Sequence, residues 1–183
     1  MNDGRLIIVA GNKRAGKTTL CSMLVEKGFI HLNCDNILDA LDEVVGSNKL
    51  DFDFFNILVS RYYRDAKNYN QNIVFDIYDF NPGMLKKLKE FNNVELLVLA
   101  YPNANKEDIK HCLQKYGEDF QWNKTMTEDD LNRNINLIVE KNKILEEECK
   151  KYNIKLFDVG IKEQRNIKIN DVFNYIIDKT NQS

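Results

Sequence analysis

The chain has 183 residues, of which 43% are hydrophobic and 30% are charged, enough to bury one substantial core but too few for two full domains. The formal net charge is −2, so no global field draws the protein toward nucleic acid or an anionic membrane. We expect one domain over residues 1–183, a monomer or homodimer with small-molecule partners.

Five short apolar runs predict strands that are buried on both faces of a parallel sheet. They cover residues 5–10, 29–34, 73–77, 94–101 and 154–159. Helical patterns separate these runs, and this alternation predicts an α/β fold of three layers, with helices on both faces of the sheet.

The helical patterns follow one another along the whole chain. Apolar residues at three- and four-residue spacing, or terminal signals such as Gly28 and Asn81-Pro82-Gly83, mark each of them. The predicted helices cover residues 16–27, 36–45, 52–69, about 82–91, 103–116, 127–152 and 169–178. No leader and no apolar run of membrane-spanning length stand out, which predicts a cytoplasmic protein.

The segment from Gly11 to Thr18 matches the pattern G-x-x-x-x-G-K-[ST], between a predicted strand and a predicted helix. In such a P-loop, backbone N–H groups and the helix N-terminus bind phosphate oxygens, Lys17 reaches the outer phosphates and Thr18 offers its hydroxyl to Mg²⁺. The predicted ligand is a nucleoside triphosphate, ATP with Mg²⁺. Its predicted binding residues are Gly11, Asn12, Lys13, Arg14, Ala15, Gly16, Lys17, Thr18 and Thr19.

Two other nucleotide-binding classes fit less well. A dinucleotide fold would use Asp35, after the second strand, for a ribose, but the glycine spacing is not G-x-G-x-x-G. A GTPase switch would use N-K-x-D, which residues 48–51 spell, but these residues precede the third strand and no D-x-x-G follows it.

Asp76 lies at the end of the third strand, where a carboxylate can hold Mg²⁺ or its waters. The other interpretation is that Asp76 only caps or solvates the end of the strand. Ile77 follows instead of a second acid, so the paired acids of hydrolytic ATPases are missing, although Asp79 is nearby.

The P-loop and this order of elements resemble the small P-loop kinases, which include nucleoside monophosphate, shikimate and gluconate kinases. The resemblance implies a parallel sheet of order 2-3-1-4-5, a helical insert at about residues 36–70 that covers the acceptor, and a lid at about residues 103–130. It also implies that Asp35 contacts the acceptor hydroxyl. The other interpretation is that Asp35 caps the helix that follows it.

The resemblance also suggests roles for individual residues near the phosphates and the acceptor. Arg61 and Arg64 share a helix face, where they either hold an anionic acceptor group or are simply solvated. Arginines of the lid normally neutralise the transferring phosphoryl group, but here residues 102–132 contain none. Arg14 and Arg133 are the remaining candidates for this catalytic role. Gly160 occupies the position that meets the adenine ring.

We therefore predict a kinase that transfers a phosphoryl group from ATP to a small acceptor, nucleotide-like or anionic. The alternative is a nucleotide-binding regulatory protein, or a GTPase-type switch, without kinase activity. His31 and His111 have no partners at metal-ligand spacing. Trp122 is expected to be a lid or packing residue and not a platform for base stacking, and the four cysteines are expected to pack in the core.

Overall fold

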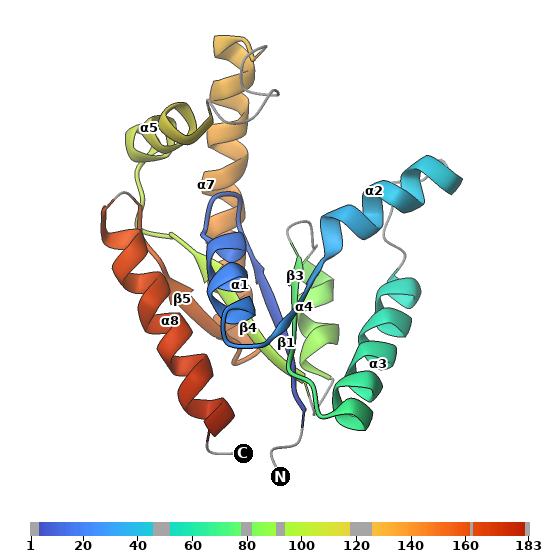
Figure 1. Ribbon diagram of the computed structural model, residues 1–183. Coiled ribbons are helices and arrows are strands. Elements are labelled where there is room, and N and C mark those ends of the chain that lie inside the picture. Colours follow the sequence, from blue (N-terminus) through green and yellow to red (C-terminus); the bar gives the residue numbers. More distant parts are fainter. Residues whose placement is uncertain are drawn as a thin grey trace.

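The structure is a computed structural model that describes residues 4–45, 52–77, 82–90, 94–117, 126–161 and 163–181. Its centre is a sheet of five parallel strands in the order β2-β3-β1-β4-β5, which confirms the predicted order (Figure 1). The strands are β1 (Leu6–Gly11), β2 (Ile30–Asn33), β3 (Ile73–Ile77), β4 (Val94–Ala100) and β5 (Lys155–Asp158).

Helices cover both faces of this sheet, as the three-layer prediction requires. They are α1 (Lys17–Val25), α2 (Cys34–Val45), α3 (Phe52–Tyr69), α4 (Pro82–Lys89), α5 (Lys106–Gly117), α7 (Glu128–Lys151) and α8 (Glu163–Asn181). Figure 1 shows α2 leading away from the sheet on one side, while α5 and the first half of α7 extend beyond it on the other. Within the described ranges, no helix is both long and apolar enough to cross a membrane.

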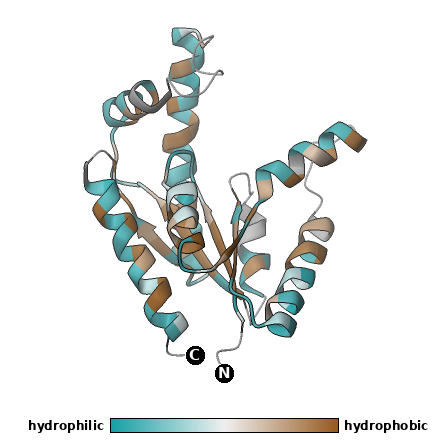
Figure 2. Ribbon diagram, viewed as in Figure 1, coloured by the Kyte–Doolittle hydropathy of each residue, from teal (hydrophilic) through white to brown (hydrophobic). Residues whose placement is uncertain are grey.

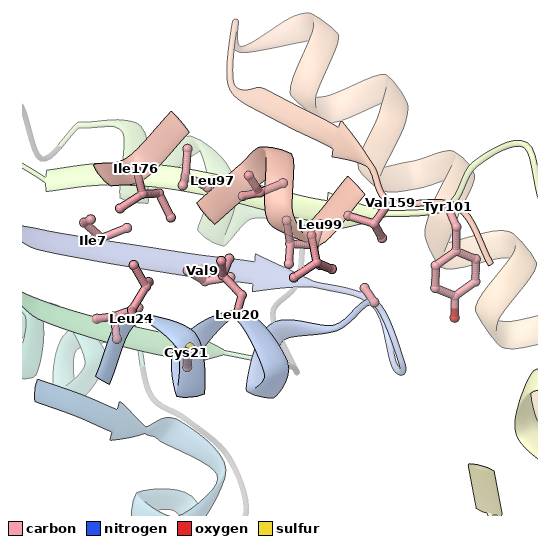
Figure 3. Packing of buried hydrophobic residues seen from close by; sticks show 14 of the residues in the cluster. Ile7, Val9, Leu20, Cys21, Leu24, Leu97, Leu99, Tyr101, Val159 and Ile176 are labelled. Atoms are coloured by element: carbon pink, nitrogen blue, oxygen red, sulfur yellow. The ribbon is translucent and has the colours of Figure 1, made fainter. Parts of the chain in front are cut away.

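The continuous apolar runs arise because each central strand contributes to two cores. In β1, Leu6 and Ile8 pack toward α3 and α4, whereas Ile7 and Val9 pack toward α1, α5 and α8. Successive side chains of a strand point to opposite faces, so a strand covered on both sides needs an apolar residue at every position. Figure 2 shows these strands as the hydrophobic centre of the molecule, and Figure 3 shows the core beneath α1 and α8.

Two predicted boundaries were wrong. The second strand ends at Asn33, and Asp35 belongs to the first turn of α2 instead of ending the strand. The cap of α2 is Asn33, whose Oδ1 accepts a hydrogen bond of 3.2 Å from the Asn36 N–H. The last helix begins at Glu163, well before Ile169, because its first turns are polar and carry no apolar stripe.

Candidate functional site

The Gly11–Thr18 segment forms a sharp turn between β1 and α1. Arg14 and Gly16 have φ angles of 60° and 84°, in the left-handed region. A Cβ on Gly11 would lie 2.1 Å from the Leu99 carbonyl oxygen, so the chain can turn here only with glycine. Gly16 is the N-cap of α1 and has no side chain to cap it. The N–H groups of the first turn of α1 therefore suit an anionic ligand.

Three elements hold this loop from outside through hydrogen bonds. Nδ2 of Asn12, a fully buried residue, donates to the Ile138 carbonyl of α7 at 2.9 Å. The Tyr101 hydroxyl, just after β4, donates to the Lys13 carbonyl at 2.5 Å. Nη1 of Arg165 on α8 donates to the Arg14 carbonyl at 3.1 Å. These bonds fix the peptide planes on which phosphate binding by N–H groups depends.

The Lys17 side chain folds back over the loop and is only 9% exposed. Its Nζ donates to the carbonyls of Gly11 at 3.3 Å and Asn12 at 3.1 Å. Burial lowers the Lys17 pKa from 10.5 to about 8, against the opposing effect of the negative charges of Asp76 and Asp35. The ammonium group is therefore charged at neutral pH, and it lies within electrostatic reach of both carboxylates.

Asp76 lies at the carboxyl edge of the sheet, one residue before β3 ends. It is 5% exposed and pairs in register with Val9 of β1 and Asn33 of β2. Asp35, by contrast, is exposed in the first turn of α2, directly after the strand that neighbours β3. The fold therefore brings Lys17, Asp76 and Asp35 to one edge, although they come from three separate elements.

Thr18 and Thr19 are exposed in the first turn of α1, so their hydroxyls are accessible to a ligand. The Thr18 carbonyl accepts a hydrogen bond of 2.9 Å from the Ser22 Oγ. Ala15, in contrast, is fully buried, and it packs the loop against the core beneath α1.

Gly160 lies in the turn between β5 and α8, with a φ angle of 59°. Its N–H donates to Oδ1 of Asp158 at 3.0 Å, and Oδ2 of Asp158 accepts from Asn103 at 2.8 Å. The same helix, α8, reaches the phosphate loop through Arg165, and its Ile169 would lie 2.8 Å from a Cβ on Gly16. The predicted adenine position is thus on a segment that is tied to the loop.

The structure does not bring all the predicted arginines to the loop. Arg61 and Arg64 are exposed on α3. Ala66, on the same helix, lies against Gly4 at the amino end of β1, the end opposite the phosphate loop. Arg133 is 74% exposed on α7, and its Nη1 lies 3.8 Å from Oδ1 of Asp130. Arg14 alone is part of the loop itself.

Some residues that support the site were not predicted. Asn142 of α7 is 2% exposed and accepts a hydrogen bond of 3.2 Å from the Tyr101 N–H. A signal for it existed, because the apolar stripe of this helix, with Ile138 and Leu145, is interrupted by an asparagine at 142. Tyr101 and Arg165 gave no such signal, because their contacts join distant segments.

Spacing along the chain predicted no metal-ligand partner for His31, but the fold brings two candidate ligands next to it. Its Nε2 lies 3.2 Å from Oδ1 of Asp76, and Cys21 completes a group of candidate ligands. Spacing along the chain could not reveal this group, because its members lie on α1, β2 and β3. All four cysteines are buried and free, as their predicted packing roles require. Asp79, Trp122 and residues 48–51 lie outside the described residues.

Comparison with known proteins finds no matching family model and no matching curated protein. Solved structures do match. A shikimate kinase from Acinetobacter baumannii in complex with shikimate has a TM-score of 0.56 at 14% identity, and the match covers 97% of this chain and 96% of that one. A gluconokinase from Sinorhizobium meliloti 1021 has a TM-score of 0.52 at 14% identity, with 98% and 99% covered.

A second shikimate kinase, from Bacteroides thetaiotaomicron, has a TM-score of 0.52 at 15% identity, with 94% of this chain and 98% of that one covered. These likenesses extend over nearly the whole chain, and at this identity they show the fold. The chain therefore has the P-loop α/β fold that small kinases share, as its sequence resemblance implied.

Proposed function

We propose that the protein is an ATP-dependent kinase that transfers the γ-phosphoryl group to a small-molecule acceptor. The observation that carries the proposal is the position of Lys17. Its charged group is held over the phosphate loop and within electrostatic reach of Asp76 and Asp35. Phosphoryl transfer depends mainly on alignment and charge stabilisation. This edge of the sheet offers a positive group for the phosphates and carboxylates for the metal ion and the acceptor.

The residues present fit ATP with Mg²⁺. The glycine-containing turn and the uncapped start of α1 suit phosphate oxygens, and the exposed Thr18 hydroxyl with the Asp76 carboxylate suits the ion. When bound, Mg²⁺ neutralises phosphate charge. Lys17 binds the outer phosphates, Arg14 is available beside them, and the turn at Gly160 borders the adenine ring.

Asp35 is the residue that we assign to the acceptor. It is exposed, so an incoming hydroxyl can reach it, and its negative charge acts on Lys17. The alternative interpretation was that Asp35 caps α2, but Asn33 makes that capping hydrogen bond. Asp35 therefore orients the acceptor hydroxyl and accepts its proton.

The surrounding segments complete the proposal. Residues 1–183 form one domain. Within it, the helical insert at about residues 36–70 covers the acceptor, and the segment at about 103–130 acts as the lid. Arg133, exposed near the start of α7, is the arginine that a closing lid can bring to the phosphates. Arg61 and Arg64 receive less support as acceptor ligands, because they lie on α3 toward the amino edge of the sheet.

A nucleotide-binding regulatory protein without catalysis is the second candidate. The observation that favours it is the absence of arginine from residues 102–132, where kinases of this kind neutralise the transferring group. A GTPase-type switch receives less support, and comparing the affinities for ATP and GTP tests it.

The test is a screen for transfer from ATP labelled in its γ-phosphate. Candidate acceptors are nucleoside monophosphates, sugars, sugar acids and small alcohols, each incubated with the protein and Mg²⁺, and with Lys17→Ala as the background. The kinase proposal predicts a labelled product with one acceptor class, absent with Lys17→Ala. Tight ATP binding with no acceptor-dependent transfer would instead favour the regulatory protein.

A further inference from the structure

Cys21, His31 and Asp76 form a compact group behind the phosphate loop. Their candidate ligand atoms, one sulfur, one ring nitrogen and one carboxylate oxygen, all lie within 4.8 Å of one another. In register, His31 pairs with Val74 and Asn33 pairs with Asp76, so His31 and Asp76 lie diagonally on adjacent strands. Figure 3 shows Cys21 on the face of α1 that packs on the sheet.

The polar atoms of this group are buried and poorly satisfied. The Asp76 side chain is 7% exposed and that of His31 20%. Nε2 of His31 and Oδ1 of Asp76 are 3.2 Å apart, which is an ion pair when His31 is protonated, yet among the described residues neither atom has an aligned hydrogen-bond partner. A buried carboxylate oxygen without a hydrogen bond is costly and calls for a missing partner. A cation bound by both atoms would be such a partner.

The ligand types indicate which cation this is. Magnesium prefers oxygen ligands, whereas a set of thiolate, imidazole and carboxylate suits Zn²⁺ and similar borderline ions. Burial raises the pKa of Cys21, so without a metal its thiol keeps its proton. Ligand atoms around tetrahedral zinc are about 3.5 Å apart. The three side chains therefore need to close by only roughly 1 Å.

We propose that Cys21, His31 and Asp76 bind a thiophilic divalent metal of the Zn²⁺ class. On binding, the Cys21 thiol releases its proton to solvent, and water occupies the fourth position. The charge of Lys17, which is within reach of Asp76, opposes the metal and limits its affinity. If Asp76 also holds the Mg²⁺ of the nucleotide, which rests on the proposed function, then Zn²⁺ and Mg·ATP compete for this carboxylate.

Cobalt absorption spectroscopy on the full, nucleotide-free chain tests the site without any assay of activity. Titration with Co²⁺ is expected to give a near-ultraviolet thiolate-to-cobalt band at one metal per chain, which Zn²⁺ abolishes. Cys21→Ser is expected to lose the band, and His31→Gln to weaken Co²⁺ binding by at least about tenfold, because even contacts that only orient a ligand contribute about 10- to 100-fold. Cys149→Ser, which changes a buried cysteine of α7 outside the group, is the matched control.

Absence of the thiolate band in the parent chain would overturn the proposal, as would a band that survives in Cys21→Ser. If Cys21→Ser does not fold, judged by circular dichroism, His31→Gln decides: unchanged Co²⁺ affinity in that variant would overturn the site as well.

A second titration tests the shared carboxylate. With Zn²⁺ at about ten times its dissociation constant, competition is expected to lower the apparent affinity for Mg·ATP by roughly tenfold in the parent chain. Cys21→Ser should show only the smaller loss caused by zinc binding to ATP in solution. If the cobalt band is present but Zn²⁺ lowers the Mg·ATP affinity equally in the parent and in Cys21→Ser, the metal site is supported and Asp76 is not a ligand of the magnesium ion. ATP binding in zinc-free buffer reports on the proposed function separately.

Discussion

The two sides of the proposed site at the carboxyl edge of the sheet differ in how their polar residues are held. On the phosphate side, Asn12, Lys17 and Asn142 are buried, and hydrogen bonds from α7, α8 and the end of β4 fix the loop. On the proposed acceptor side, Asp35 is exposed in the first turn of α2. Under the proposed function, this contrast implies that phosphate binding relies on buried residues, whereas acceptor choice depends on surface side chains.

This difference has a physical reason. Phosphate is bound largely by backbone N–H groups, whose directions depend on the whole fold, so its site must be packed and rigid. An acceptor is recognised by side chains that the fold does not require, and exposed substitutions of this kind usually change stability little.

Asp35→Asn is expected to lower turnover by about 10²- to 10⁴-fold, because an amide cannot accept the acceptor's proton. Affinity for Mg·ATP and the free energy of unfolding should remain close to those of the parent, since Asp35 is exposed. Steady-state kinetics with the acceptor found in the labelled-ATP screen, together with calorimetry, measures both. Asp39→Asn, an exposed carboxylate further along α2, is the control. Turnover within about threefold of the parent would remove Asp35 from catalysis.

Lys17→Met is expected to stabilise the nucleotide-free protein by about 1 to 3 kcal/mol at pH 7, because it removes a buried charge. In the parent, Lys17 is charged in both the folded and the unfolded chain below pH 8. The folded state therefore bears the full destabilising effect of the buried charge in that pH range. Between about pH 8 and 10.5, Lys17 loses its proton in the folded chain but keeps it in the unfolded chain. The parent therefore becomes more stable as the pH rises, and the difference in free energy of unfolding between Lys17→Met and the parent becomes smaller.

Urea unfolding of the parent and Lys17→Met at pH 7 and pH 10 measures this difference. Lys27→Met, at an exposed residue after α1, should change stability little at either pH. A destabilised Lys17→Met, or a stability difference that widens with pH, contradicts the account of the buried ammonium.

Tyr101→Phe is expected to destabilise the protein by about 1 kcal/mol, through loss of the hydrogen bond to the Lys13 carbonyl. Nucleotide affinity should fall severalfold in parallel, because that bond fixes the loop. Urea unfolding and calorimetry provide the two measurements. Tyr69→Phe, which alters a tyrosine that is 68% exposed, should change neither quantity. Unchanged affinity in Tyr101→Phe would mean that the loop keeps its shape without this anchor.

Arg61→Ala and Arg64→Ala are expected to have the smallest effects, with the KM for the acceptor within about twofold and stability within about 0.5 kcal/mol. Both residues are exposed on a helix that lies, at Ala66, against the amino end of β1. Steady-state kinetics decides between this outcome and the acceptor role that the resemblance implied. A tenfold rise in KM for either variant would show that α3 approaches the acceptor during catalysis.

The sequence allowed the turn from Gly11 to Thr18 and its place in the sheet to be predicted, because the signals for them are local. The glycines, Lys17 and Thr18 form one continuous motif, and the apolar strands on each side require a sheet covered on both faces. The parallel order then places Asp76 next to β1. These steps need only spacing, burial and the handedness of crossovers.

The remaining features depend on contacts between distant segments. His31 meets Asp76 and Cys21 only because β2 pairs with β3 beneath α1, and no periodicity along the chain encodes that meeting. The cap at Asn33 was missed because Asp35 is an equally good capping residue, and only backbone geometry separates the two. Exposed acceptor residues carry no packing constraint, so their partners cannot be predicted from the pattern.

We expect the loop from Gly11 to Thr18 to bind the phosphates of ATP through Lys17. Isothermal titration calorimetry of Mg·ATP against the parent and Lys17→Ala tests it most directly. We expect one site per chain in the parent and a loss of affinity of about 10- to 100-fold in Lys17→Ala, the cost of a charge-assisted phosphate contact. Equal affinities in two folded proteins would contradict the account.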